Sequence, residues 1–183
     1  MDKKSNKAVT VINDGVYGSN FADGELRLSL LRSPAFSGHP FWDRLIVVQD
    51  RYLPRIDQGE RLYRFWFNAG KVCQRLDAVD REALVRNEKP FALSFYPPGQ
   101  GSKPKSGPTL SDNAVQITAM KCAENGRDII VRLFEPTGKK RSTTLRLPFV
   151  SMSMKVDMKG FEIKTLKINP RTKKVCEVNL LEK

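Results

Sequence analysis

The sequence contains few cysteines, and their number and spacing argue against a disulfide-stapled fold. Cys73, Cys122 and Cys176 are odd in number, and no two of them have C-x-x-C spacing. A disulfide framework needs an even set, whereas unpaired thiols are usual in a reducing compartment. We therefore expect packed core thiols and a cytoplasmic protein.

Histidine is almost absent. His39, between Gly38 and Pro40, is the single histidine in 183 residues. Most zinc sites built on histidine, and catalytic centres of the Ser-His-Asp or Cys-His type, depend on imidazole. The sequence therefore leaves little room for such a centre, and we interpret His39 as a loop residue.

Long hydrophobic runs are also missing. No apolar stretch approaches the roughly 20 residues that span a bilayer. The lysines of MDKKSNKAVTV are not followed by the apolar segment of a signal peptide. With 40% hydrophobic and 28% charged residues and a formal net charge of +12, the chain is predicted to be a soluble, basic, ordered protein without a membrane partner, folded as a single domain over residues 1–183.

Alternation of apolar and polar residues in steps of two recurs along the chain and predicts strands. Only one helix is predicted, over residues 76–86, with Asp77 or Asp80 as its N-cap. Short strands joined by turn residues are typical of an all-β, antiparallel β-sandwich rather than of βαβ units. The predicted strands are 9–12, 25–31, 62–67, 115–122, 128–134, 143–147, 152–157, 161–168 and 175–180.

One segment departs from this composition. Residues 96–109, YPPGQGSKPKSGPT, are rich in Pro, Gly and Ser and lack an apolar period. Such a composition predicts a mobile surface loop. We place the loop within the single domain, because division at this point would leave two incomplete β units with unpaired edges.

The positive charge is concentrated late in the chain, with 15 basic and 7 acidic side chains from residue 121 onward. These basic residues mostly alternate with apolar ones, as in residues 164–168, and the aromatic residues lie elsewhere. A nucleic-acid interface would place basic and aromatic side chains together on one face. We interpret the pattern as a solvated sheet face and expect no nucleic-acid partner.

The densest polar segment is the predicted loop at residues 13–24, NDGVYGSNFADG. It lacks the Lys-Ser/Thr ending and the following helix of a phosphate-binding loop. The oxygen acceptors of Asn13 and Asp14 beside the ring of Tyr17 suit a sugar, whose hydroxyls donate hydrogen bonds and whose apolar face stacks on an aromatic ring.

Four segments, spread between about Val9 and Leu181, resemble the C-terminal β region of the α-mannosidases of glycoside hydrolase family 38, in particular the bacterial-type branch. The first contains Tyr17-Gly18 ahead of LSLLRSP, and the third contains RLFEPTG. The segments are VTVINDGVYGSNFADGELRLSLLRSP at 9–34, DQGERLYRFWF at 57–67, VQITAMKCAENGRDIIVRLFEPTGKKRSTTLRLPF at 115–149 and FEIKTLKI at 161–168.

This resemblance implies a β-sandwich of the galactose-mutarotase-like supersandwich type. Enzymes of the family are retaining, zinc-dependent exo-mannosidases whose zinc ligands and aspartate nucleophile lie in an amino-terminal domain. We therefore expect the chain to be a fragment of a larger enzyme, with that amino-terminal catalytic domain and α-mannosides as partners. The chain itself is expected to hold no cofactor, to leave zinc to the catalytic domain, and to hydrolyse nothing alone.

The resemblance also implies which residues lie toward the sugar cleft. Asn13, Asp14, Tyr17, Arg32 and Asp57 are expected to be secondary sugar contacts or struts between domains. One departure concerns the last of them: where family members often carry a histidine after the Asp-x-Gly turn, this chain has glutamate at position 60.

The sequence leaves two other functions open. A freestanding carbohydrate-binding module would use Tyr17, Trp42 or Trp66 as a stacking platform. A basic nucleic-acid-binding β protein is the less favoured alternative. A domain that packs on a partner should also present an exposed apolar patch, for which Phe36 and Phe41 are candidates beside Trp42, and a homo-oligomer could form through it.

Overall fold

The computed structural model describes residues 5–34, 57–92 and 105–183. The chain divides into two compact units, one formed by residues 1–10 with 67–183 and the other by residues 11–66, and each is described by itself. The extent of the domain stays a prediction. Six residues named above lie outside the described ranges: Phe36, Gly38, His39, Pro40, Phe41 and Trp42.

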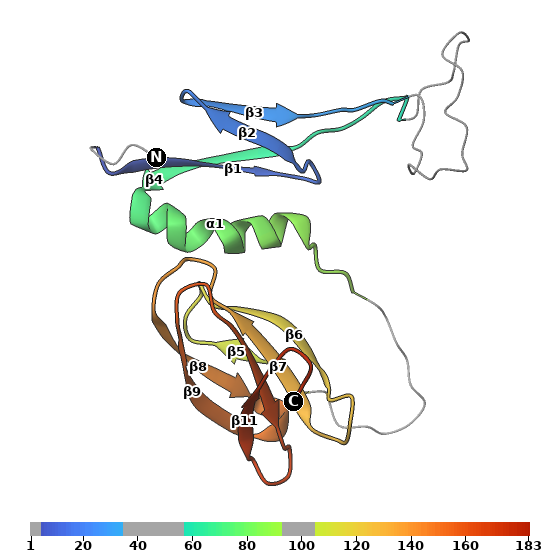
Figure 1. Ribbon diagram of the computed structural model, residues 1–183, viewed down its shortest axis with the longest axis vertical. Coiled ribbons are helices and arrows are strands. Elements are labelled where there is room, and N and C mark those ends of the chain that lie inside the picture. Colours follow the sequence, from blue (N-terminus) through green and yellow to red (C-terminus); the bar gives the residue numbers. More distant parts are fainter. Residues whose placement is uncertain (1–4, 35–56, 93–104) are drawn as a thin grey trace, which may run out of the picture. The chain divides into compact units, whose positions relative to one another are not determined.

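The described residues are mostly antiparallel strands with one α-helix, which confirms the predicted all-β, antiparallel class (Figure 1). In chain order the elements are β1 (Lys7–Asn13), β2 (Gly18–Ala22), β3 (Glu25–Ser29), β4 (Phe65–Lys71), α1 (Val72–Asn87), β5 (Thr109–Leu110), β6 (Gln116–Cys122), β7 (Ile129–Phe134), β8 (Arg141–Leu147), the 3-10 turn η1 (Pro148–Val150), β9 (Met152–Met158), β10 (Ile163–Ile168) and β11 (Val175–Val178).

Seven strands of the larger unit form a sandwich of two antiparallel sheets. One sheet has the order β11-β10-β7-β6 and the other β5-β8-β9. The chain crosses from the first sheet to the second between β7 and β8 and returns between β9 and β10. Turns at these two crossings therefore meet at the same end of the sandwich.

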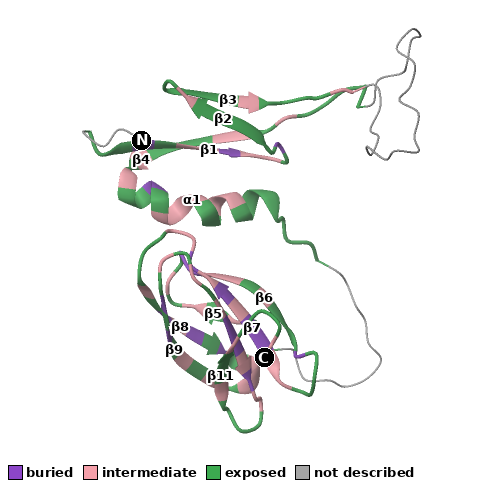
Figure 2. Cartoon of the chain, viewed as in Figure 1, coloured by how far each residue is buried: buried purple, intermediate pink, exposed green. Residues whose placement is uncertain are grey.

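The core lies between these sheets because inward positions alternate with outward ones. In β8, Thr143, Leu145 and Leu147 are buried while Ser142 and Arg146 are exposed. Figure 2 shows buried positions concentrated on the sandwich strands. Full burial of one such aliphatic side chain stabilises the fold by roughly 1.5–3 kcal/mol. The buried cluster is Val115, Val131, Leu133, Leu145, Leu147, Val156, Met158, Leu166 and Ile168.

Glu135 closes the end of the sandwich at which the two crossings meet. It is the first residue of the β7–β8 turn, and its side chain is fully buried. Arg141 Nε donates a hydrogen bond to it at 2.9 Å, and the Thr137 hydroxyl donates another. The carboxylate also accepts hydrogen bonds from backbone N–H groups of both turns: Thr137 (3.1 Å), Gly138 (2.7 Å), Lys139 (3.2 Å) and Phe161 (3.1 Å).

These contacts set the ionisation of Glu135. Burial acts to raise the pKa of the carboxyl group, but the Thr137 hydroxyl, the Phe161 and Thr137 N–H groups and the Arg141 guanidinium stabilise the carboxylate more strongly. The net result lowers the pKa from 4.5 to about 2. Glu135 is therefore a buried, fully paired anion that ties two turns together.

The helix includes the predicted residues 76–86 but begins four residues earlier. It spans Val72–Asn87, with Lys71 at the N-cap and no side-chain capping hydrogen bond. The prediction of Asp77 or Asp80 as the cap was therefore wrong, because the helix begins several residues earlier. Asp77 instead forms ion pairs with Lys139 (2.7 Å) and Arg141 (2.6 Å).

Arg75 anchors the first turns of the helix on β1. It is the buried residue of α1, its Nη1 lies 3.0 Å from a carboxylate oxygen of Glu82, and its Nη2 donates to the hydroxyl of Thr10 at 2.9 Å. The guanidinium is thus satisfied by an anion and a hydroxyl, as a buried charge requires.

The smaller unit contains the hairpin β2–β3. Phe21 pairs with Leu26 and Ser19 with Leu28, so these side chains share one face, while Arg27 belongs to the other. Phe21 is 65% exposed and Leu26 is 44% exposed. A two-stranded hairpin is marginally stable without a surface to pack on, so this apolar face is unusual for a free surface.

Several sequence predictions need correction. Residues 18–22 form β2 instead of a continuous loop, and the strand predicted at 62–67 begins at Phe65 and runs to Lys71. The described end of the predicted 96–109 loop is irregular up to Pro108, while Thr109 starts β5; residues 96–104 lie outside the described ranges. The three cysteines are free but exposed, not core thiols.

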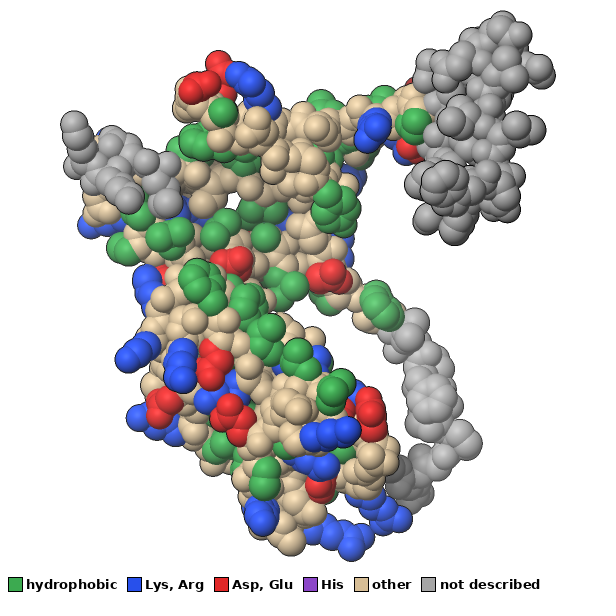
Figure 3. All heavy atoms as spheres, in the orientation of Figure 1, with side chains coloured by type: hydrophobic (Ala, Val, Ile, Leu, Met, Phe, Trp, Pro, Cys, Tyr) green, Lys and Arg blue, Asp and Glu red, His purple; other side chains and the backbone are tan. Residues whose placement is uncertain are grey.

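The surface of the sandwich carries charges of both signs. Figure 3 shows lysine and arginine side chains interspersed with aspartate and glutamate side chains over this unit. Within the described ranges, no helix has the length and apolarity needed to cross a membrane. The expected absence of nucleic-acid and membrane partners stays a prediction.

Candidate functional site

A hollow of about 400 Å³ lies in the smaller unit, where the loop after β1, the end of β3 and the segment before β4 meet. Its volume falls in the range of about 300–1,000 Å³ that is usual for ligand pockets. Its lining is Asp14, Gly15, Val16, Tyr17, Ser29, Leu30, Leu31, Arg32, Asp57, Arg61, Leu62 and Tyr63.

The loop after β1 is shaped by its own side chains. Asn13 Oδ1 accepts a hydrogen bond from the N–H of Val16 at 3.0 Å, and Gly15 has a φ of 77°, which glycine adopts without strain. This turn buries Val16 and leaves Tyr17 95% exposed. The Tyr17 ring is therefore available to a ligand from one wall of the hollow.

Each aspartate of the hollow is paired with an arginine. Asp14 Oδ2 lies 3.3 Å from Arg64 Nη1, and its N–H donates to the Arg64 carbonyl at 3.2 Å. Asp57 Oδ1 lies 3.0 Å from Arg61 Nη2. Asp57 also has a φ of 58°, a left-handed conformation that aspartate tolerates better than most residues.

Four of the five predicted site residues line this one hollow: Asp14, Tyr17, Arg32 and Asp57. They come from segments that are far apart in the sequence. Asn13 is not in the lining, and its side chain instead holds the turn before Tyr17. Their role as sugar contacts stays a prediction.

Sequence reasoning missed three residues of this region. Arg61 and Tyr63 line the hollow, and Arg64 pairs with Asp14. The segment ERLYRF contains two basic and two aromatic residues, which could have suggested a polar surface next to rings. Without knowledge of where β4 begins, however, the sequence alone does not indicate which of these side chains face the hollow.

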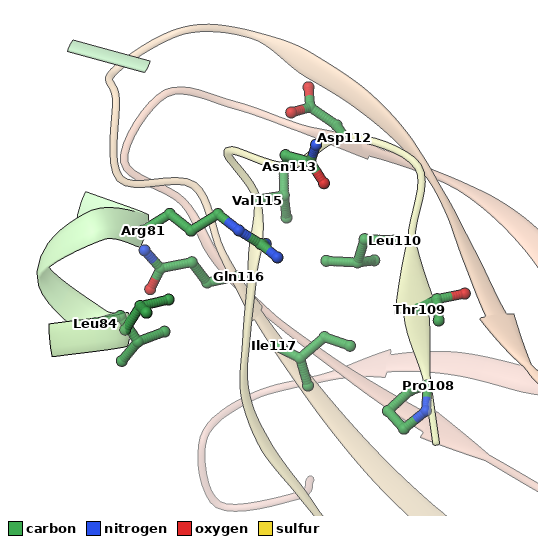
Figure 4. A pocket seen from close by; sticks show the side chains of 11 residues that line it. Arg81, Leu84, Pro108, Thr109, Leu110, Asp112, Asn113, Val115, Gln116 and Ile117 are labelled. Atoms are coloured by element: carbon green, nitrogen blue, oxygen red, sulfur yellow. The ribbon is translucent and has the colours of Figure 1, made fainter. Parts of the chain in front are cut away.

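A second hollow, of about 480 Å³, lies in the larger unit between α1 and the β5–β6 edge of the sandwich. Figure 4 shows Leu110 and Ile117 pointing into it, with the Arg81 guanidinium entering from the helix. Leu110 and Ile117 pack against the core cluster. The carboxylate of Asp112 in its wall is already bound to Arg141 at 3.2 Å and to the Ala114 N–H at 2.8 Å. This hollow is an opening onto the sandwich core, and its lining includes none of the site residues predicted from the family resemblance.

In residues 5–34, 57–92 and 105–183, no three His, Cys, Asp or Glu side chains lie together in a way that could hold a metal ion. The aspartates of the first hollow are bound to arginines and do not fit zinc. The expectation that the chain holds no cofactor stays a prediction.

Comparison with known protein families covers the C-terminal part of the chain. Residues 114–183 match the family model described as the glycosyl hydrolases family 38 C-terminal beta sandwich domain. The matched residues include β6 to β11 and the buried Glu135. No curated protein and no solved structure matches the chain.

Proposed function

We propose that the chain packs on the catalytic domain of an α-mannosidase and completes its carbohydrate cleft. The proposal is supported by the match of residues 114–183 to the model of the glycosyl hydrolases family 38 C-terminal beta sandwich domain. This match supports association with a family 38 catalytic domain and an accessory role. The cleavage of terminal α-linked mannose and the contribution to the cleft are the proposed part.

The observation that carries the proposal is the composition of the first hollow. Asp14, Tyr17, Arg32 and Asp57, named from the family resemblance, line a single hollow in the smaller unit. Carboxylates accept hydrogen bonds from sugar hydroxyls, the guanidinium donates to sugar oxygens, and an exposed ring covers the apolar face of the sugar. The hollow thus offers binding groups, and the catalytic domain would supply the acid–base chemistry.

The exposed hairpin face supports the packing role. Phe21 and Leu26 lie opposite each other on one face of β2–β3, and both are exposed. Exposed apolar side chains next to one another mark surfaces that bind a partner. We assign this face to the interface with the catalytic domain.

Association can be measured by sedimentation of the chain with a separately produced family 38 catalytic domain of the same source. A stable complex is expected, and Phe21→Ser together with Leu26→Ser should weaken it by about tenfold or more, since buried apolar anchors dominate interface energy. The matched control is Arg27→Ser on the opposite face. Its ion pair in the described part of the chain is with exposed Glu25, so this variant should leave the affinity unchanged. Absence of a complex with the unmodified chain would contradict the accessory role.

A freestanding carbohydrate-binding module is the second candidate. The 95% exposure of Tyr17 favours it, because such modules stack sugars on exposed rings. Trp66 is half-buried in β4, which makes it a poorer platform, and Trp42 lies outside the described ranges. Sugar binding by the chain without any association with a catalytic domain would favour this candidate.

A further inference from the structure

In the first hollow, each aspartate carboxylate forms an ion pair with an arginine. Asp57 is held by Arg61 at 3.0 Å, and Asp14 is held by Arg64 at 3.3 Å. Both carboxylates therefore have a basic partner, and neither is left to neutralise Arg32.

Arg32 is the unmatched group. It is exposed, it lines the hollow, and it has no ion-pair partner among the residues that the structure describes. A guanidinium carries five N–H donors in a fixed fork and no acceptor, and its best-matched ligands are carboxylate and phosphate groups, which it binds through two parallel hydrogen bonds. A concave surface with one unmatched positive charge attracts anions more strongly than a flat one.

The rest of the hollow suits a sugar ring. Tyr17 presents almost its whole side chain, and Tyr63 contributes a second aromatic wall. Aromatic side chains bind the apolar face of a ring while their hydroxyls remain available for hydrogen bonds. A sugar that carries an anionic substituent can stack on the two rings and also form hydrogen bonds to the Arg32 guanidinium.

We infer that the hollow selects sugars bearing a phosphate or a carboxylate, and that Arg32 is the residue that binds this anionic group. The inference rests on the assignment of the hollow to carbohydrate in the proposed function, and it adds the charge of the ligand. A neutral mannoside would leave the Arg32 fork without its matched acceptor. The net charge of +12 further favours the approach of an anion.

Calorimetry on the full chain, and on its complex with the catalytic domain, tests this with four probes: methyl α-mannoside, its uronic acid analogue, mannose 6-phosphate and inorganic phosphate. At least one of the two anionic sugars should bind about tenfold or more tightly than methyl α-mannoside, since hydrogen bonds to charged groups contribute more than neutral ones. Arg32→Gln should abolish this difference, and Arg32→Lys should restore it in part, because lysine keeps the charge without the fork. Arg27→Gln, at an exposed arginine outside the hollow, is the matched control.

The outcomes separate this inference from the proposed function. Equal affinity for neutral and anionic sugars overturns the inference and leaves the accessory role intact. Persistence of the anion preference in Arg32→Gln also overturns it, as does inorganic phosphate binding as tightly as the phosphorylated sugar. If no probe binds, the inference fails, while sedimentation with the catalytic domain still decides the accessory role.

Discussion

Replacement of Glu135 by alanine is expected to lower the free energy of unfolding by about 3–5 kcal/mol, the range observed when one member of a buried ion pair is removed. The side chain is fully buried, and its loss removes the carboxylate that accepts the part-buried hydrogen bonds of the Gly138 and Phe161 N–H groups. A donor that loses its acceptor costs about 1–3 kcal/mol where water cannot replace that acceptor. Arg141, which keeps Asp77 and Asp112, loses its most buried partner.

Urea denaturation followed by circular dichroism measures this change. Glu177→Ala is the matched control, because the Glu177 side chain is 61% exposed on the same sandwich and forms an ion pair with Lys164 at 3.4 Å. Exposed pairs of this kind contribute about 0–1 kcal/mol. If both variants lost the same small amount of stability, Glu135 would not be the group that holds the two turns together.

The second large effect is a dependence of stability on pH in the acid range. The folded-state pKa of Glu135 is lowered from 4.5 to about 2, so the folded protein binds this proton more weakly than the unfolded chain. Stability from this group is fully present above the unfolded pKa and is lost as the pH falls through the folded one. A difference of this size corresponds to about 3 kcal/mol, lost between about pH 5 and pH 2.

Unfolding by urea at a series of pH values checks this expectation. The unmodified chain should lose stability steeply over that interval. Glu135→Gln should start less stable and show a shallower slope, since glutamine does not titrate. Glu177→Gln should retain the steep slope, because its carboxylate is mostly exposed. An unchanged slope in Glu135→Gln would show that other carboxylates cause the acid sensitivity.

Much of the sandwich is predictable from the sequence because its alternation is strong. In β8 the buried Leu145 and Leu147 alternate with polar neighbours, and the strand has the predicted place. Strand β2 was missed because Gly18–Ala22 has no apolar alternation and follows a turn-rich loop. The cysteines illustrate the reverse error: composition favours burial of thiols, yet the position of each on its strand or helix leaves it exposed.

The hollow is predictable only in part. The residues implied by the family resemblance gather there, apart from Asn13, whose amide is used by its own turn. The pairing of Asp14 with Arg64 joins positions 50 residues apart, and no local pattern in the sequence indicates such a contact. Glu135 is a similar case, because a glutamate in an EPTG turn is expected on the surface, and only the meeting of two turns buries it.

The most direct test of the accessory role is the rate of α-mannoside hydrolysis by a separately produced family 38 catalytic domain, with zinc present, in the absence and presence of this chain. The account predicts no turnover by the chain alone and a rise of at least tenfold in the activity of the catalytic domain when the chain is added. Hydrolysis by the chain alone, or a catalytic domain whose activity and sedimentation the chain leaves unchanged, would contradict it.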